Sequence, residues 1–393
     1  MGSTSTWEKG SPCDSSKGSS TSIPAIPVLH EKYGSAIDSS PELHTSFFAT
    51  YFSCERKRLD TVTVSNRPLL VIGTRPEAIK MAPVVLALRR QGDKEPIVCF
   101  TGQHRELLTH AAHYFGISPD VDLDLMRPNQ GLNGLLARCL EGLDDAITRY
   151  RPGILVAQGD TTTVAAAAVA AFHRGIPFAH VEAGLRTGNL TSPWPEEFNR
   201  RVAAISAAIH CAPTKRSAEN LRREGINNRT IHVTGNTVID ALFFTLARER
   251  MNHAQWLRKY PRLADHRVVL ITGHRRENHG DVQAALFQSI RRLAEAFPDV
   301  CFVFPVHPNP VVRTAAQRIL GQLANVMLTA PADYPEFVWL MDQASVIITD
   351  SGGVQEEAPS LAKPVLVTRD TTERPEAIES GAATLVGRCP NKL

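Results

Sequence analysis

Residues 69–90 read LLVIGTRPEAIKMAPVVLALRR, a short apolar run that leads through a polar loop into a helical pattern. The run Leu69–Ile72 is continuously apolar, as in strands that are covered on both faces of a sheet. The segment from Pro76 to Arg90 has the spacing of a helix. A buried strand followed at once by a helix predicts a parallel sheet built from β-α-β units.

The same alternation continues along the chain, breaks near Gly235 and then starts again. We therefore predict an α/β fold class with two domains, at residues 66–235 and 236–393, and a cleft between them. Ligands of such sheets bind beyond the carboxyl ends of the strands. Further strands are expected at Ile97–Phe100, Ile154–Ala157, Phe178–Val181, Ile209–Ala212, Val268–Thr272, Cys301–Pro305, Val326–Leu328, Val346–Thr349 and Val365–Val367.

Composition places the chain among ordinary globular proteins. Of its 393 residues, 43% are hydrophobic and 21% are charged, and the formal net charge of +3 gives no signal for nucleic acid or a membrane surface. The seven cysteines form no C-x-x-C pair, which favours a reduced, cytosolic compartment over a disulfide framework. No apolar run is long enough for a transmembrane helix. Residues 1–20 contain twelve Ser, Thr or Gly, and we expect residues 1–65 to form a disordered extension.

The loop after the first strand, Gly73 to Glu77, lacks the G-x-G-x-x-G pattern of a dinucleotide site. The absence of the G-x-G-x-x-G pattern argues against bound NAD and so against a mechanism that begins with oxidation. Arg75 stands at a helix start, where free N–H groups help to bind an anionic ligand. A solvated loop charge is the alternative interpretation of this arginine.

A second loop, ITDSGGVQEE at residues 348–357, runs from a strand into Ser-Gly-Gly at a helix N-terminus. Bare backbone allows a diphosphate to approach closely there. Glu357 lies four residues beyond Gly353, where its carboxylate can accept hydrogen bonds from ribose hydroxyls. The pattern favours a nucleotide diphosphate, and the alternative is a Ser351 helix cap whose two glycines ease the turn.

Three acidic residues, Asp160, Glu182 and Glu196, follow strands or loops of the first predicted domain. Paired carboxylates in a partly dry cleft suit proton abstraction from carbon, because their pKa values can be pushed apart. A helix cap is the alternative for Asp160. The loops that carry His274 and His307 lack zinc-binding spacing, so we interpret them as anion or sugar contacts rather than metal ligands.

Nine segments in order resemble the non-hydrolysing UDP-N-acetylglucosamine 2-epimerases of bacteria, over residues 69–387. The resemblance implies two Rossmann-like domains in the glycosyltransferase-B arrangement, with the active site in the interdomain cleft, usually as a homodimer. It also implies reversible conversion of UDP-GlcNAc to UDP-ManNAc without metal or nicotinamide, by loss of UDP to 2-acetamidoglucal and re-addition. The segments are GTRPEAIKMAP (73–83), TGQHRELL (101–108), GDTTT (159–163), HVEAGLRTGN (180–189), SPWPEEFNRR (192–201), TGNTVIDAL (234–242), TGHRREN (272–278), PVHPNP (305–310) and DSGGVQEEAPSLAKPVLVTRDTTERPEA (350–377).

The resemblance also implies roles for individual residues. The positions that match catalytic ones are Asp160, Glu182, Glu196 and His274. Those that match substrate- or UDP-binding ones are Arg75, Lys80, Arg200, His307, Phe337, Ser351, Gly352, Gly353 and Glu357. Those in the segment that helps many bacterial members to bind a second UDP-GlcNAc as activator are Gln103, His104 and Glu106. We expect Arg75, Arg200 and His274 to neutralise the departing diphosphate, while the three acids share proton transfer at C2.

The sequence departs from that family at both ends. The N-terminal extension has no counterpart, and we expect the chain to lack a further helix and an Asn-Pro-Tyr-Gly-like turn that return to the first domain in relatives. Three other functions stay open. They are a hydrolysing epimerase that releases ManNAc and UDP, a glycosyltransferase that uses a nucleotide sugar on the same fold, and a UDP-sugar-binding remnant without activity.

Overall fold

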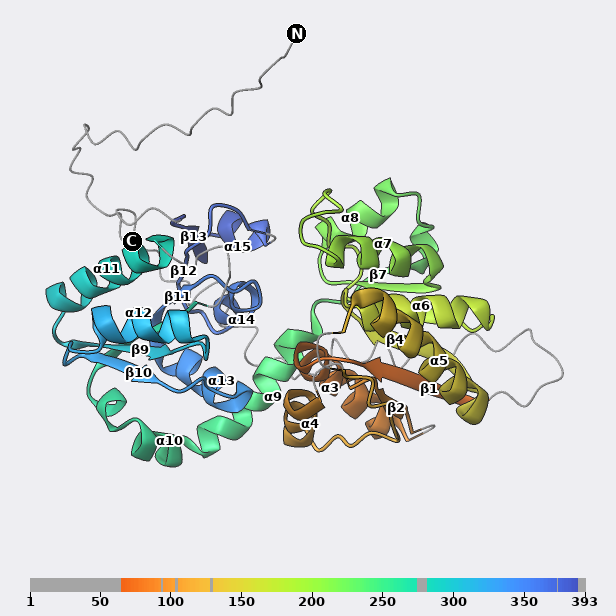
Figure 1. The fold of residues 1–393 in the computed structure, drawn as a ribbon, viewed down its shortest axis with the longest axis horizontal. Coiled ribbons are helices and arrows are strands. Elements are labelled where there is room, and N and C mark those ends of the chain that lie inside the picture. Colours follow the sequence, from red (N-terminus) through yellow and green to blue (C-terminus); the bar gives the residue numbers. More distant parts are fainter. Residues whose placement is uncertain are drawn as a thin grey trace, which may run out of the picture. The chain divides into compact units, whose positions relative to one another are not determined.

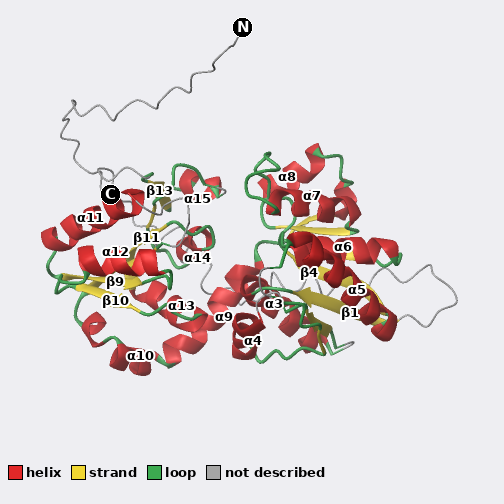
Figure 2. Cartoon of the chain, viewed as in Figure 1, coloured by secondary structure: helices red, strands yellow, loops and turns green. Residues whose placement is uncertain are grey.

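The computed structural model describes residues 65–92, 95–102, 105–127, 130–273, 281–372 and 374–387. Residues 1–64 of the predicted extension lie outside this set, and so do the predicted site residues Gln103, His104 and His274. Figure 1 shows the elements in chain order, and Figure 2 separates helices from strands. The described chain forms two parallel sheets with helices between successive strands, so the predicted α/β class is confirmed.

The first sheet has seven strands in the order β3-β2-β1-β4-β5-β6-β7, and neighbouring strands pair in parallel. Its strands are β1 Ser65–Ile72, β2 Ile97–Phe100, β3 Val121–Asp122, β4 Pro152–Gln158, β5 Phe178–Val181, β6 Ile209–Ala212 and β7 Ile231–Val233. The helices that connect them are α3 Arg75–Gln91, α4 Arg105–Tyr114, α5 Leu132–Tyr150, α6 Thr162–His173, α7 Glu196–Ser206 and α8 Lys215–Arg223. A short 3-10 helix, η2 Asn228–Thr230, precedes the last strand.

The second sheet has six strands in the order β10-β9-β8-β11-β12-β13, again paired in parallel. Its strands are β8 Arg267–Thr272, β9 Val300–Pro305, β10 Val326–Thr329, β11 Ala344–Thr349, β12 Val365–Val367 and β13 Ala383–Leu385. Between β7 and β8 the chain forms α9 Thr237–Met251, α10 His253–Lys259 and the 3-10 helix η3 Pro261–Ala264. The later helices are α11 Asp281–Ala296, α12 Pro310–Leu320, α13 Tyr334–Gln343, α14 Val354–Ser360 and α15 Pro375–Glu379.

The start of α3 shows how the sequence fixes a loop of the site. Thr74 caps the helix by accepting the Glu77 backbone N–H, while the Glu77 carboxylate accepts the Thr74 N–H at 2.9 Å. Gly73 is required before this cap, because a Cβ there would lie 2.3 Å from the Thr163 hydroxyl oxygen. The loop that carries Arg75 and Lys80 therefore has one well-defined path.

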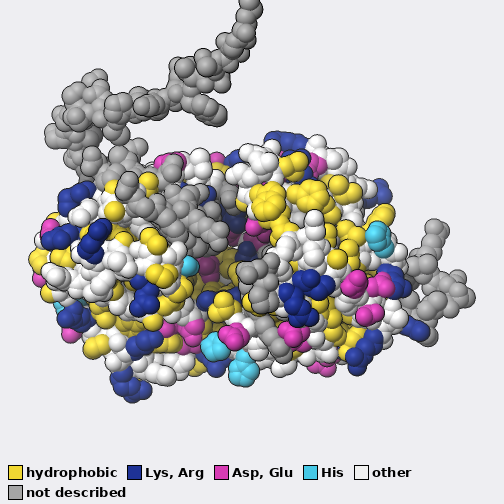
Figure 3. Space-filling model, viewed as in Figure 1, with side chains coloured by type: hydrophobic (Ala, Val, Ile, Leu, Met, Phe, Trp, Pro, Cys, Tyr) yellow, Lys and Arg dark blue, Asp and Glu magenta, His cyan; other side chains and the backbone are white. Residues whose placement is uncertain are grey.

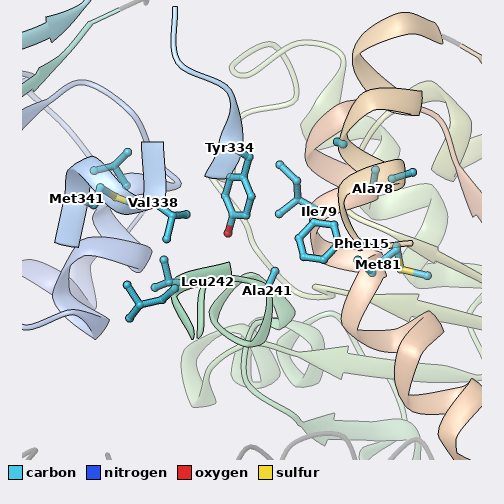
Figure 4. Close-up of a cluster of buried hydrophobic side chains, with 14 of the residues drawn as sticks. Ala78, Ile79, Met81, Phe115, Ala241, Leu242, Tyr334, Val338 and Met341 are labelled. Atoms are coloured by element: carbon cyan, nitrogen blue, oxygen red, sulfur yellow. The ribbon is translucent and has the colours of Figure 1, made fainter. Parts of the chain in front are cut away.

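Helix α9 packs against α3 on one side and α13 on the other. In Figure 4, Ala241 and Leu242 of α9 lie below Ile79 of α3 and Val338 of α13, within the same group of buried side chains. All of these side chains belong to one buried cluster that also includes strand residues of both sheets. The cover helices of the two sheets thus share a continuous core.

Four cysteines lie buried in the described part of the chain. Cys99 and Cys211 are on strands of the first sheet, Cys139 is on α5, and Cys301 is on β9. Burial raises the pKa of the Cys99 and Cys211 thiols to about 12 each. Within the described ranges, no helix combines the length and the apolar composition needed to cross a membrane.

Candidate active site

Several of the predicted site residues that the structure describes follow the carboxyl ends of strands, as expected for parallel sheets, and others lie on the helices that come next. In the first sheet, Asp160 follows β4 and Glu182 follows β5. In the second, His307 follows β9, and the Ser351–Gly353 turn follows β11. Because these strand ends lie at one edge of each sheet, residues far apart in the sequence come together there.

Glu182 accepts hydrogen bonds from three side chains among the described residues at this edge. Lys80 Nζ donates to both of its oxygens at 2.8 Å, and the Gln158 amide nitrogen donates to Oε2. Asn236 Nδ2 donates to Oε1 at 3.0 Å, and an Arg374 guanidinium nitrogen lies 3.6 Å from the same oxygen. Glu182 and Lys80, which were predicted as separate site residues, therefore form an ion pair that three further polar side chains surround.

These contacts fix the charges of the pair. Burial by itself raises the pKa of Glu182, but the Lys80 and Arg374 cations outweigh burial and lower that pKa to about 2. Burial likewise lowers the pKa of Lys80, and the Glu182 and Glu356 carboxylates reverse this and raise it. Near neutral pH, Glu182 is an anion and Lys80 a cation.

The sequence did not predict that Asn236 and Arg374 contact Glu182. Asn236 donates a second hydrogen bond, at 2.5 Å, to Glu356 Oε2 on α14, and Arg374 Nε donates to Glu356 Oε1. Asn236 and Arg374 fall within the family-like segments, but neither has a residue type or spacing that predicts contact with Glu182. The hydrogen bonds of Asn236 span 54 and 120 residues of sequence, so only the fold reveals them.

Asp160 is paired with a predicted binding residue. Arg200 on α7 donates to Asp160 Oδ2 from Nε at 2.8 Å, and a second guanidinium nitrogen lies at 2.7 Å. The alternative role of Asp160 as a helix cap is wrong, because Thr161 caps α6 by accepting the Val164 N–H. Asp160 is thus an ion-paired side chain at the strand end, with 26% of its side chain exposed.

A buried histidine supports the loop that carries Asp160. His180 Nε2 lies 2.7 Å from the Gly159 carbonyl oxygen, and burial lowers the pKa of His180 to about 4. The ring is therefore neutral near pH 7, and its Nε2–H donates to the carbonyl. A Cβ on Gly159 would lie 3.9 Å from Glu182 Oε2, so the Asp160 loop runs close to the Glu182 carboxylate.

The two adjacent acids at the start of α7 have different environments. Glu197 is fully buried and accepts the backbone N–H groups of Thr187 at 3.1 Å and Gly188 at 3.3 Å. It also lies 3.3 Å from a guanidinium nitrogen of Arg200. Glu196 is half-buried, and its carboxylate has no hydrogen bond or ion pair with any described residue. Of the two, only Glu197 is held by contacts with described residues.

Glu77 joins the loops after β1 and β4. Its Oε1 accepts the Thr161 hydroxyl at 2.6 Å, and its Oε2 accepts the Gly73 N–H at 2.5 Å. Burial raises the pKa of Glu77 to about 7, and these hydrogen bonds lower it only in part. Since Thr161 caps α6 and Glu77 belongs to the α3 cap, the two helix starts share one carboxylate.

The remaining predicted nucleotide-binding residues belong to elements of the second sheet. The helix cap of α14 is Gly353 without a side-chain hydrogen bond, so the alternative of a Ser351 cap is wrong. Glu357 is buried one turn later, and its Oε1 accepts the Tyr334 hydroxyl at 3.0 Å. Burial raises the pKa of Glu357 to about 7. Phe337 is half-buried on α13, and His307 Nδ1 accepts the Asn309 N–H at 3.3 Å.

Arg75 faces a small pocket of about 90 Å³. His110 of α4 and Asp333 and Tyr334 at the start of α13 also line this pocket. Glu106, an exposed residue of α4, lies one turn before His110. No group of three His, Cys, Asp or Glu side chains in the described chain is arranged to hold a metal ion. What the site can offer a ligand is anion-binding cations, buried carboxylates and bare backbone.

A family model described as UDP-N-acetylglucosamine 2-epimerase matches residues 86–393. The UDP-N-acetylglucosamine 2-epimerase of Salmonella typhimurium is 51% identical over 323 residues, which cover 81% of this chain and 86% of that protein. The chain belongs to the UDP-N-acetylglucosamine 2-epimerase family. The sequence resemblance to this family is confirmed.

Solved structures of epimerases share the fold. The UDP-GlcNAc 2-epimerase of Neisseria meningitidis bound to UDP-GlcNAc has a TM-score of 0.78 and 47% identity, covering 83% of this chain and 89% of that chain. The Methanocaldococcus jannaschii UDP-GlcNAc 2-epimerase in complex with UDP-GlcNAc and UDP has a TM-score of 0.69 and 31% identity, covering 83% and 90%. The predicted glycosyltransferase-B type of this epimerase-family fold is confirmed.

Proposed function

We propose that the chain catalyses the reversible C2 epimerisation of UDP-GlcNAc to UDP-ManNAc. The proposal rests on one observation above all. A family member whose structure was solved with UDP-GlcNAc shares 47% of its residues with this chain over most of both proteins. The geometry supports it, because Asn236 links Glu182, the partner of Lys80, to α14, which carries Glu357 and follows the Ser351–Gly353 turn.

The proposed reaction is an elimination followed by an addition. A base removes the C2 proton, and the C2–H electron pair forms the C1=C2 double bond of 2-acetamidoglucal. The C1–O bond breaks, and its electrons leave on the β-phosphate oxygen of UDP. Return of a proton to the other face of C2 and of UDP to C1 gives the epimer, so no net oxidation takes place.

The environments of Glu182, Glu196 and Asp160 differ, which suggests that the three acids have different roles in the reaction. Glu182, with its pKa lowered to about 2, is a poor base, and we assign it to electrostatic stabilisation of positive charge that develops at C1. Glu196 has no bonded partner among the described residues, so it is the better placed group to exchange a proton with C2. Asp160 shares proton transfer when substrate displaces or reorients Arg200. His274 keeps its proposed catalytic role and lies outside the described residues.

Charge that builds on UDP must be stabilised by cations and N–H groups, which supply the larger part of the rate enhancement. We assign this role to Arg75, Arg200 and His274, with Lys80 as a further binding residue and the Ser351–Gly353 backbone around the diphosphate. Glu357 is placed to accept ribose hydroxyls in exchange for its Tyr334 hydrogen bond. Phe337 and His307 complete the proposed nucleotide half.

The test is to incubate the protein with UDP-GlcNAc in D₂O and to identify the products. We expect UDP-ManNAc, with deuterium at C2 of both epimers, because the C2 proton exchanges during elimination and re-addition. Free ManNAc and UDP would identify the hydrolysing alternative. Retention of the original hydrogen at C2 in all UDP-ManNAc would exclude this mechanism.

Other features of the family remain proposals for this chain. We propose that a second UDP-GlcNAc binds as an activator through the segment that contains Gln103, His104 and Glu106; the first two of these residues lie outside the described part of the chain. UDP-ManNAc alone should then react slowly until a trace of UDP-GlcNAc is added.

A homodimer in the cytosol is likewise proposed, and sedimentation of the purified chain tests the dimer. Hydrophobic side chains gather over α7 and α8 on the face that Figure 3 shows.

A further inference from the structure

Asn236 occupies an unusual position at the start of α9. Its Oδ1 accepts the Val238 N–H at 3.2 Å and so caps the helix. Because the oxygen of the amide is engaged by the helix, the NH₂ group must point away from it, toward the carboxylates. A rotated amide would place the oxygen against those carboxylates and the NH₂ group against the helix N–H.

The NH₂ group donates to two carboxylates at once. One bond reaches Glu182 Oε1 at 3.0 Å, after β5 of the first sheet, and the other reaches Glu356 Oε2 at 2.5 Å, on α14 beside the second sheet. Arg374 contacts the same two carboxylates, and Lys80 contacts Glu182. Two anions and two cations surround a neutral amide, so the formal charges of this cluster cancel.

The backbone of Glu182 needs such support. Its φ of 64° lies in the left-handed region, which is strained for a residue that carries a side chain. Lys80 and Gln158 hold the carboxylate from the first sheet. Asn236 and Arg374 hold it from the side of α14. The orientation of Glu182 therefore depends on contacts made by both groups of residues.

We propose that Asn236 is a positioning residue, which fixes the Glu182 carboxylate in its working orientation by bridging it to Glu356. The inference rests on the proposed epimerase function and adds a residue to its machinery. Because Glu356 adjoins Glu357 in the predicted ribose site, the bridge also links the position of Glu182 to the helix start that holds the nucleotide.

The decisive substitution is Asn236→Asp. Aspartate caps a helix as well as asparagine does, so α9 keeps its cap. The NH₂ donor is replaced by a carboxylate oxygen that faces two carboxylates. The charged and titratable groups around Glu182 are Lys80 on α3, His180 on β5, Glu356 and Glu357 on α14, and Arg374 before α15.

We expect kcat to fall at least about 100-fold in Asn236→Asp, with KM for UDP-GlcNAc changed less than about threefold, as for loss of an interaction used in the transition state. A like charge this close shifts a carboxyl pKa upward by about 1–3 pH units, so the acid limb of the kcat profile should move to higher pH. If Asn236 served only as the cap of α9, the Asn236→Asp substitution would change neither kcat nor the acid limb of the kcat profile.

A second substitution restores the charge balance. In Asn236→Asp with Glu356→Gln, the amide stands at position 356 and the carboxylate at 236, so the cluster again has two anions. We expect kcat to recover at least about tenfold over Asn236→Asp alone, and the acid limb to shift back part of the way, because the carboxylate at position 236 still faces Glu182. The matched control is Asn227→Asp, where an exposed asparagine caps η2 by accepting the Arg229 N–H at 3.0 Å. Asn227→Asp should leave kcat, KM and the pH profile unchanged.

An independent readout separates this inference from the proposed function. Titration of ¹³C-labelled glutamate carboxyls by NMR, with Glu182 assigned by its loss in Glu182→Gln, should show the Glu182 pKa raised in Asn236→Asp and lowered again in the double variant. If the parent makes no UDP-ManNAc, the proposed function fails, while the titration still tests the bridge. An unchanged Glu182 titration, or an unchanged kcat and pH profile in Asn236→Asp, would overturn the inference.

Discussion

At the scale of single residues, the site combines carboxylates whose pKa values are pushed in opposite directions. Glu182 is held as an anion by Lys80 and Arg374, whereas burial raises the pKa of Glu77 and Glu357 to about 7. Their positions after buried strands made Glu182 and Glu357 predictable from the sequence. Asn236 and Glu356 were not predictable, because their function depends on partners that only the folded chain brings together.

The lowered pKa of Glu182 predicts how stability depends on pH. Because this pKa lies below the unfolded value, the pairing contributes fully above about pH 4.5, and its contribution is lost as pH falls toward 2. Glu182→Gln removes the contribution, on the order of 3 kcal/mol. Urea unfolding should therefore show a gap between parent and variant that narrows from pH 7 to pH 3. A gap that is constant over this range would contradict the prediction.

The contrast between Glu196 and Glu197 gives a second prediction. Glu196→Gln should lower kcat at least about 100-fold with little change in thermal stability, because its carboxylate bonds to no described residue. Glu197→Gln should cost about 1–3 kcal/mol of stability, since it weakens several buried hydrogen bonds. Turnover assays and melting curves of both variants distinguish the roles. The reverse pattern would assign the chemistry to Glu197.

At the scale of elements, the continuous apolar runs predicted the central strands correctly. The strands β3, β7 and β13 were missed, and all three lie at sheet edges and contain two or three residues. An edge strand has a neighbour on one side only and needs no continuous apolar run. These edge strands contain polar residues, such as Asp122 in β3 and His232 in β7. A search for continuous apolar runs therefore does not find them.

The helix caps give a prediction at this scale. Thr74 caps α3 and Thr214 caps α8, each through its hydroxyl and the backbone N–H three residues later. Replacing either by valine should cost about 1 kcal/mol in urea unfolding. Only Thr74→Val should also lower kcat, because Arg75 and Lys80 follow that cap. Equal turnover in the two variants would show that the α3 cap does not position the site.

At the scale of the whole molecule, the helices that cover the two sheets meet in one buried cluster around α9. Tyr114 of α4 adds a polar link, since its hydroxyl donates to the buried Glu249 of α9 at 2.7 Å. The sequence break near Gly235 indicated two α/β units, but the shared core was not predictable. Periodicity identifies which face of a helix is buried, and it does not identify the partner.

The shared core predicts coupled unfolding. Leu242 is fully buried between α3 and α13, so Leu242→Ala should cost about 2–5 kcal/mol. Because both sheets lose packing, hydrogen exchange in β1 and in β8 should quicken together. Peptide-level exchange measured by mass spectrometry tests this. Faster exchange confined to one sheet would show that the two halves unfold separately.

The buried cysteines have a consequence for the life of the protein under oxidative stress. Alkylating agents and peroxides attack the thiolate, and burial keeps Cys99, Cys139, Cys211 and Cys301 protonated and out of reach. These four sulfur atoms can therefore be modified only after the structure around them opens. Three of them lie on strands that are next to an edge strand, and one lies on the helix α5. The rate at which each cysteine is modified therefore reports how often its part of the sheet opens, and no mutation is needed to measure it.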